Sequence, residues 1–131
     1  MFSLIEFIHM ATIEIYARHG KHDELTGNLT LVGTQQADEL GYFLAGKRYD
    51  LDPDNSIVLH SMAERARETA EIIAQILGLK SEETMYLGGP AGNPVLDSWM
   101  FEHLSPVFDS HGLVVCVTHD DQTKVLARAA R

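Results

Sequence analysis

A five-residue run near the end of the chain, Leu113-Val114-Val115-Cys116-Val117, contains only apolar side chains. A continuous apolar run of this length is typical of a strand that is covered on both faces. Such strands are common in parallel sheets, where the connecting helices lie on both sides of the sheet. The run therefore predicts a central strand of an α/β fold.

The rest of the sequence alternates between strand and helix patterns. Short apolar strands are expected over 12–17 and 56–60, with helices over 30–44 and 61–77. Thr30 is expected to cap the first helix, Ser61 to open the second through a capping box with Glu64, and Gly78 to end it. Further along, we expect a strand over 84–87, a helix over 95–108 interrupted at Pro106, and a helix over 121–131. This order predicts a three-layer α/β/α sandwich with a mostly parallel sheet.

Length and charge limit the classes of function. The 131 residues suffice for about one domain, and the net charge of −9 disfavours nucleic acid or an anionic membrane surface as a partner. The single cysteine, Cys116, cannot form an internal disulfide, so the cytoplasm is the expected compartment. Residues 1–9 are apolar without the features of a signal peptide, and we interpret them as an extension ahead of a domain over 10–131.

Polar residues follow three of the expected strands. Arg18-His19-Gly20 follows the first, Ser61 with Arg65 one turn later follows the second, and Thr118-His119-Asp120 follows the apolar run. The carboxyl ends of parallel strands meet at one edge, where ligands bind. Arginine forks there could hold a phosphoryl group without a metal ion. One histidine could act as the nucleophile, and the other could stabilise charge on the equatorial oxygens.

These segments resemble, in sequence and order, the histidine phosphatase superfamily, also called the phosphoglycerate mutase-like family. The resemblance rests on the Arg18-His19-Gly20 triplet, on Leu29-Thr30-x-x-Gly33, on Ser61-x-x-x-Arg65-Ala66-x-x-Thr69-Ala70 with Met62 in place of a proline, and on the strand before His119. It implies that His19 accepts the phosphoryl group, that Arg18 and Arg65 clamp it, and that His119 is a second imidazole in the pocket. Asn28 and Ser61 are further candidates for substrate binding.

Other polar residues have simpler interpretations. Arg67 should point away from Arg65 into solvent, and Lys21 and His22 should either line the mouth of the pocket or belong to an exposed loop. The remaining histidines are expected to be structural: His9, His60, His103 and His111. No Cys or His pair has the spacing of metal ligands, so we expect neither a metal nor another cofactor.

The sequence departs from the family pattern at two places. Many members carry a glutamate after the third strand as the proton donor, whereas this chain reads Leu87-Gly88-Gly89-Pro90 there. The candidates for a substitute acid are Asp97, Glu102 and Asp120, the last because the acid-phosphatase branch uses a His-Asp pair. The chain also ends one helix after His119, so the domain could be short at its C-terminus. Residues 1–9 are then expected to cover the open sheet edge or to mediate a homodimer.

The missing acid also limits the substrate. A phosphohistidine needs no acid, because its imidazole leaving group has a conjugate-acid pKa of about 6.5. The pattern thus favours a metal-independent phosphatase similar to the small SixA-type phosphohistidine phosphatases, acting on a phosphorylated protein or a small phosphorylated metabolite. A non-catalytic phosphate-binding member with a regulatory role is the alternative. A phosphoglycerate mutase fits less well, since the stretch between Arg65 and His119 is too short for a lid that excludes water.

Overall fold

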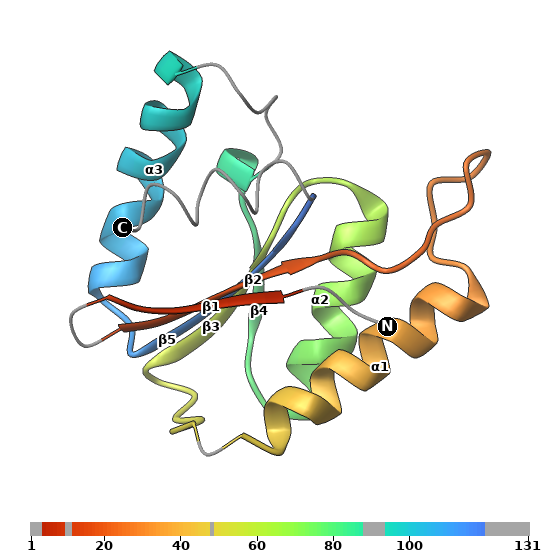
Figure 1. Cartoon of the computed structure of the whole chain (residues 1–131), viewed down its shortest axis with the longest axis horizontal. Helices are drawn as coiled ribbons and strands as arrows, with labels where there is room; N and C mark the ends of the chain where they lie inside the picture. The colour runs from red at the N-terminus through yellow and green to blue at the C-terminus, as the bar shows by residue number, and fades with distance from the viewer. Residues whose placement is uncertain (1–3, 10–11, 48, 88–93, 120–131) are drawn as a thin grey trace.

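The structure, a computed structural model, describes residues 4–9, 12–47, 49–87 and 94–119 (Figure 1). In chain order its elements are β1 (Leu4–His9), β2 (Thr12–Arg18), α1 (Leu31–Ala45), β3 (Ser56–His60), α2 (Glu64–Leu77), β4 (Ser81–Glu83), the 3-10 turn η1 (Met85–Leu87), α3 (Pro94–Asp109) and β5 (Leu113–Thr118). No helix within these ranges is both long enough and apolar enough to span a bilayer.

The strands form one five-stranded sheet in the order β1-β2-β5-β3-β4. β2, β5, β3 and β4 run parallel, and only β1 is antiparallel to its neighbour. The apolar run lies in β5, at the centre of the sheet, where Val115 pairs with Ile15 on one side and Val58 on the other. Every residue of β5 is buried, which confirms the interpretation of this run as a strand covered on both faces.

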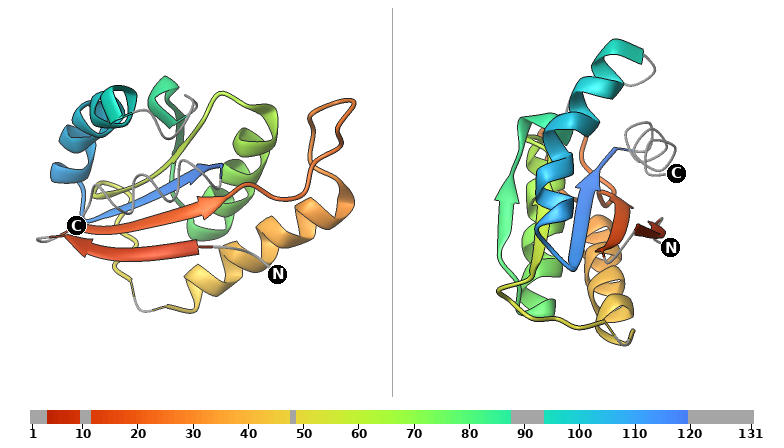
Figure 2. Two further views of the ribbon diagram at one scale, coloured as in Figure 1. Left: turned by 45° about the horizontal axis from the view of Figure 1, so that its top comes forward. Right: turned by 90° about the vertical axis from the view of Figure 1, so that its left-hand side faces the viewer.

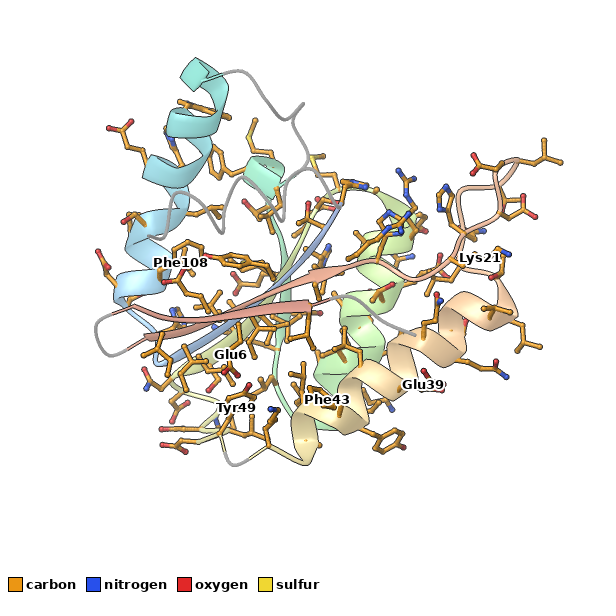
Figure 3. All side chains as sticks on the ribbon, in the orientation of Figure 1. Glu6, Lys21, Glu39, Phe43, Tyr49 and Phe108 are labelled. Carbon is orange, nitrogen blue, oxygen red and sulfur yellow. The ribbon has the colours of Figure 1, made fainter. Side chains whose placement is uncertain are left out.

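Helices cover both faces of the sheet, with α1 and α2 on one side and α3 on the other (Figures 1 and 2). Alternate residues of β5 enter two separate cores, as the pleat of a strand requires. Val115 and Val117 pack in the core beneath α1 and α2, whereas Val114 and Cys116 pack in the core beneath α3. Phe108 of α3 points toward the sheet in this second core (Figure 3). The three-layer α/β/α prediction is therefore confirmed.

The apolar segment at the N-terminus contributes an edge strand. β1 pairs with β2 along its whole length, from Leu4 opposite Ala17 to His9 opposite Thr12. β1 thus covers the edge of β2 that faces away from β5, and Leu4 packs against the core beneath α1 and α2. This matches the first of the two arrangements expected for residues 1–9.

Two local predictions hold and three are wrong. Thr30 caps α1 by accepting a hydrogen bond from the Gly33 amide at 3.0 Å, and Gly78 ends α2 with a φ of 70°. The third strand, however, is β4 at Ser81–Glu83, whereas residues 84–87 hold the turn η1. β4 is a largely exposed strand of three residues, and the turn η1 that follows buries Leu87 in the core beneath α3.

The second error concerns Pro106, since α3 continues through it to Asp109. A proline so near the helix C-terminus breaks only one backbone hydrogen bond, and the side chain of Pro106 is exposed. The third concerns Ser61, which does not cap α2. The N-cap is Ala63 without a side-chain hydrogen bond, because Ser61 extends the strand ladder and donates its amide to the Val117 carbonyl at 3.2 Å. The helix predicted over 121–131 lies outside the described residues.

Candidate active site

The carboxyl ends of β2, β5 and β3 meet at one edge of the sheet (Figure 1). Two backbone hydrogen bonds extend the ladders beyond the strands themselves. The His19 amide donates to the Thr118 carbonyl at 3.0 Å, and the Ser61 amide donates to the Val117 carbonyl at 3.2 Å. The parallel topology therefore brings the residues that follow three strands to the same place, as the sequence predicted.

His19 lies at the centre of this edge with 8% of its surface exposed. Its Nδ1–H donates to the Gly20 carbonyl at 2.8 Å, so the other ring nitrogen, Nε2, carries the lone pair. Arg65, in the first turn of α2, donates its Nε–H to His19 Nε2 at 3.3 Å. The ring of His119 lies edge-on to that of His19, with 4.9 Å between the ring centroids. Arg65 and His119, two of the predicted site residues, are thus both in contact with the ring of His19.

His19 is held in its neutral form. Its pKa falls from 6.5 to about 4, mainly because of burial, which outweighs the opposing hydrogen bond to Gly20, and the nearby charges of His119, Arg65 and Arg18 act in the same direction as burial. At neutral pH the lone pair on Nε2 is therefore free of a proton. A neutral imidazole with a fixed tautomer is the form that a nucleophilic histidine requires.

Two glycines allow the loop after β2 to lie against the start of α1. A Cβ on Gly20 would stand 2.4 Å from the Gly33 carbonyl oxygen, and a Cβ on Gly33 would stand 1.9 Å from the Lys21 carbonyl oxygen. Both distances are far below van der Waals contact, so neither position admits a side chain without a backbone shift. The glycines of the Arg18-His19-Gly20 and Leu29-Thr30-x-x-Gly33 segments are therefore needed for one backbone contact.

Thr69 connects the same loop to α2. The Gly20 amide donates to Thr69 Oγ1 at 3.0 Å, and the Thr69 hydroxyl donates to the Arg65 carbonyl at 2.8 Å. One buried side chain, that of Thr69, thus links Gly20, whose carbonyl orients His19, to the helix turn that carries Arg65. Thr69 had no predicted role, although its position one turn after Arg65 is the signal that could have indicated a contact between the two residues.

A cavity of about 320 Å³ opens beside His19, between the loop after β2 and α1. Its lining combines cationic, acidic and apolar side chains: Arg18, His19, Gly20, Lys21, His22, Glu24, Gln36, Ala37, Leu40 and Thr69. Lys21 marks this end of the molecule in Figure 3. Lys21 and His22 both line this cavity, and Lys21 is at the same time exposed, so the two alternatives given for it do not exclude each other.

The remaining site candidates lie as follows. Arg18 is the last residue of β2 and is exposed at the cavity. Ser61 is fully buried, and its hydroxyl has no hydrogen-bond partner among the described residues. Asn28 is exposed and is not part of the cavity lining. Asp120 lies outside the described residues, so its role stays a prediction.

Residues expected to be peripheral occupy separate places. Arg67 pairs on the surface with Glu64 and with Glu71, the latter at 2.8 Å. His60 is buried and donates its Nδ1–H to the Ser61 carbonyl at 2.8 Å, which is a structural contact. Across the described ranges, no group of three or more His, Cys, Asp or Glu side chains is placed to hold a metal ion.

The fold and the site together define an α/β protein with a cluster of imidazole and guanidinium groups at the carboxyl edge of its sheet. Comparison with known families agrees with this description. The sequence profile described as "Histidine phosphatase superfamily (branch 1)" matches residues 15–87, which is more than half of the chain. The chain belongs to this superfamily, as its sequence motifs indicated.

Several solved structures share the fold. A SixA protein from Agrobacterium tumefaciens superposes with a TM-score of 0.70 at 19% identity, covering 92% of this chain and 76% of its own. The protein histidine phosphatase SixA complexed with tungstate gives 0.64 at 20% identity, covering 87% and 73%. A mycobacterial glucosyl-3-phosphoglycerate phosphatase in complex with VO₃ gives 0.67 at 16% identity, covering 87% and 79%. No curated protein matches the sequence significantly.

Proposed function

We propose that this protein is a metal-independent phosphatase that transfers a phosphoryl group first to His19 Nε2 and then to water. The observation that carries the proposal is the state of His19, which is buried, neutral, oriented with its Nε2 toward Arg65, and in ring contact with His119. Membership in a superfamily of phosphatases supports the same activity.

The first half-reaction follows from this geometry. The lone pair on His19 Nε2 attacks phosphorus, and the bond to the leaving group breaks with its electron pair going to that group. Arg65 and Arg18 offer guanidinium N–H groups to the phosphoryl oxygens, and such charge-assisted hydrogen bonds are about twice as strong as neutral ones. His119 would stabilise the charge that develops on the equatorial oxygens.

For the substrate, we propose a phosphohistidine on a protein, or a small phosphoester whose leaving group departs without a strong acid. The support is chemical, since the segment after η1 begins Gly88-Gly89-Pro90 and offers no carboxylate. The SixA proteins among the structures of similar fold are consistent with a protein substrate, and the glucosyl-3-phosphoglycerate phosphatase with a small one. The cytoplasm remains the expected compartment, given the single cysteine.

Hydrolysis of p-nitrophenyl phosphate and of a phosphohistidine peptide tests the proposal. His19→Ala should abolish turnover, because it removes the Nε2 atom that would attack phosphorus beside Arg65. Arg65→Ala should lower kcat by about 10²–10³-fold, as the loss of one preorganised charge donor typically does.

Arg67→Ala is the matched control, since Arg67 lies on the same helix but pairs with Glu64 and Glu71 at the surface. It should leave kcat unchanged. Turnover that survives in His19→Ala would refute the mechanism. Tight binding of phosphate without any turnover by the unaltered chain would instead support the non-catalytic alternative.

A further inference from the structure

A third imidazole adjoins the nucleophile from the loop after β2. The rings of His22 and His19 meet edge-on, with 5.3 Å between their centroids and 79° between their planes. Both rings line the same cavity of about 320 Å³, whereas His119 is not part of that lining. His22 therefore lies beside His19 on the wall of a space large enough for several water molecules, each of which occupies about 30 Å³ in the liquid.

The backbone holds His22 in this position. His22 forms an isolated antiparallel bridge with Leu29, and the Thr30 amide donates to the Lys21 carbonyl at 2.9 Å. Asp23 closes the turn that follows by accepting the Leu25 amide at 2.8 Å. His22 itself is only partly exposed, with 22% of its side-chain surface accessible. These contacts hold the backbone that carries the His22 ring.

An acidic side chain lies beside the His22 ring. The Nε2 atom of His22 is 3.7 Å from Glu24 Oε1. Both residues line the cavity, together with the cations Arg18 and Lys21. A carboxylate at this distance can stabilise positive charge that forms on the ring during a reaction.

The second half-reaction of the proposed function needs such a group. Once His19 is phosphorylated, a water molecule must attack phosphorus from the side opposite to Nε2 and lose a proton as it does so. A base must lie within about 2.6–3.2 Å of that water. Water must attack whatever the first leaving group was, so a base is needed even for a phosphohistidine substrate. Gly88-Gly89-Pro90 stands where many family members carry the glutamate that could serve as this base.

We propose that His22 is the general base for hydrolysis of the phosphorylated His19, with Glu24 stabilising the imidazolium that forms. This inference rests on the proposed function. A lone pair of the water oxygen forms the new P–O bond, and the P–Nε2 bond breaks with its electron pair returning to His19. The proton of the water passes to the unprotonated ring nitrogen of His22. Inorganic phosphate departs, and His22 releases the proton to solvent.

The test separates the two half-reactions in His22→Gln by rapid-quench kinetics with p-nitrophenyl phosphate. Because kcat/KM reports the steps up to phosphorylation of His19, it should stay within about threefold of the unaltered chain. The value of kcat should fall by about 10²-fold, which is the low end for loss of a general base. A burst of p-nitrophenolate close to one per enzyme should appear, with an alkali-stable, acid-labile phosphoenzyme in the quenched samples.

Two further variants keep the result interpretable. His111→Gln makes the same chemical change next to the start of β5, at the opposite edge of the sheet, and should show neither the burst nor the loss of kcat. Glu24→Gln, an exposed position that the fold does not need, should show the same pattern as His22→Gln with a smaller loss.

Each outcome decides one question. Equal losses of kcat and kcat/KM in His22→Gln, without a phosphoenzyme, would overturn the base role and assign His22 to binding. Unchanged kinetics would also overturn it. If the unaltered chain forms no phosphoenzyme and releases no phosphate, the proposed function itself fails, and the role of His22 fails with it.

Discussion

The neutral state of His19 predicts how stability changes with pH. In the folded protein the pKa of His19 is about 4, compared with 6.5 for a free histidine. Between these values the unfolded chain binds the proton that the folded chain excludes. Folding stability at this residue is therefore fully present above pH 6.5 and is lost as the pH falls toward 4.

The magnitude follows from the two pKa values. Their difference corresponds to about 3 kcal/mol in full, of which about 2 kcal/mol is lost between pH 7 and pH 5. Since other histidines also titrate in this range, the quantity to measure is the difference in unfolding free energy between the unaltered chain and His19→Gln. Glutamine cannot take up the proton, so this difference should shift by about 2 kcal/mol against the unaltered chain on acidification.

Urea denaturation at pH 7 and pH 5 provides the measurement, and His19→Asn serves as a second replacement of different size. The free energies of unfolding of the two variants should differ at pH 7. The change in each variant's unfolding free energy relative to the unaltered chain between pH 7 and pH 5 should be the same for both. If the difference in unfolding free energy is the same at both pH values for both variants, His19 is not held neutral by the fold. That result would refute the interpretation of His19 as an unprotonated nucleophile.

Two further predictions concern the frame of the site. Gly33→Ala should lower the free energy of unfolding by about 1–3 kcal/mol or more and lower kcat, because its Cβ would overlap the Lys21 carbonyl. Gly46→Ala, at a φ of −76° with no contact below 3.5 Å, should be neutral or stabilising by up to about 1 kcal/mol. Denaturation and the p-nitrophenyl phosphate assay check both. Removal of residues 1–9 should lower the unfolding midpoint and promote association, because β2 loses its antiparallel partner; an unchanged midpoint and elution volume would show that β1 is dispensable.

The fold could be predicted from the sequence where local pattern and topology agree. The apolar run in β5 can be satisfied only by cover on both faces, and α1 and α2 on one face with α3 on the other provide that cover. Once the sheet is parallel, the residues after each strand must share an edge. This is why His19, Arg65 and His119 could be grouped from sequence although they lie far apart along the chain.

Other features depend on contacts that no local pattern contains. β4 ends at Glu83, and the turn η1 then buries Leu87 in the core beneath α3. The contacts of Leu87 in that core depend on the packed helix and not on the local sequence. Ser61 has the sequence of a capping residue, yet the ladder with β5 holds its backbone in the sheet. The partner of β1 was equally hidden, because an apolar edge strand gives no sign of which edge it will join. His22 was ambiguous because only the folded loop brings its ring to His19.

The spacing of the motifs has a physical explanation in the contacts around Gly20. Its carbonyl fixes the tautomer of His19, its amide is held by Thr69, and its missing Cβ leaves room for the backbone of Gly33. Thr69 in turn donates to the carbonyl of Arg65, whose guanidinium faces Nε2 of His19. The ring of His19 is therefore oriented by the Gly20 carbonyl, while Gly20 itself is held by Thr69 and packs against Gly33. Because the Gly20 backbone sets the orientation of His19, other groups such as His22 can lie on its cavity side. Members of one fold can differ in chemistry through the side chains at such positions.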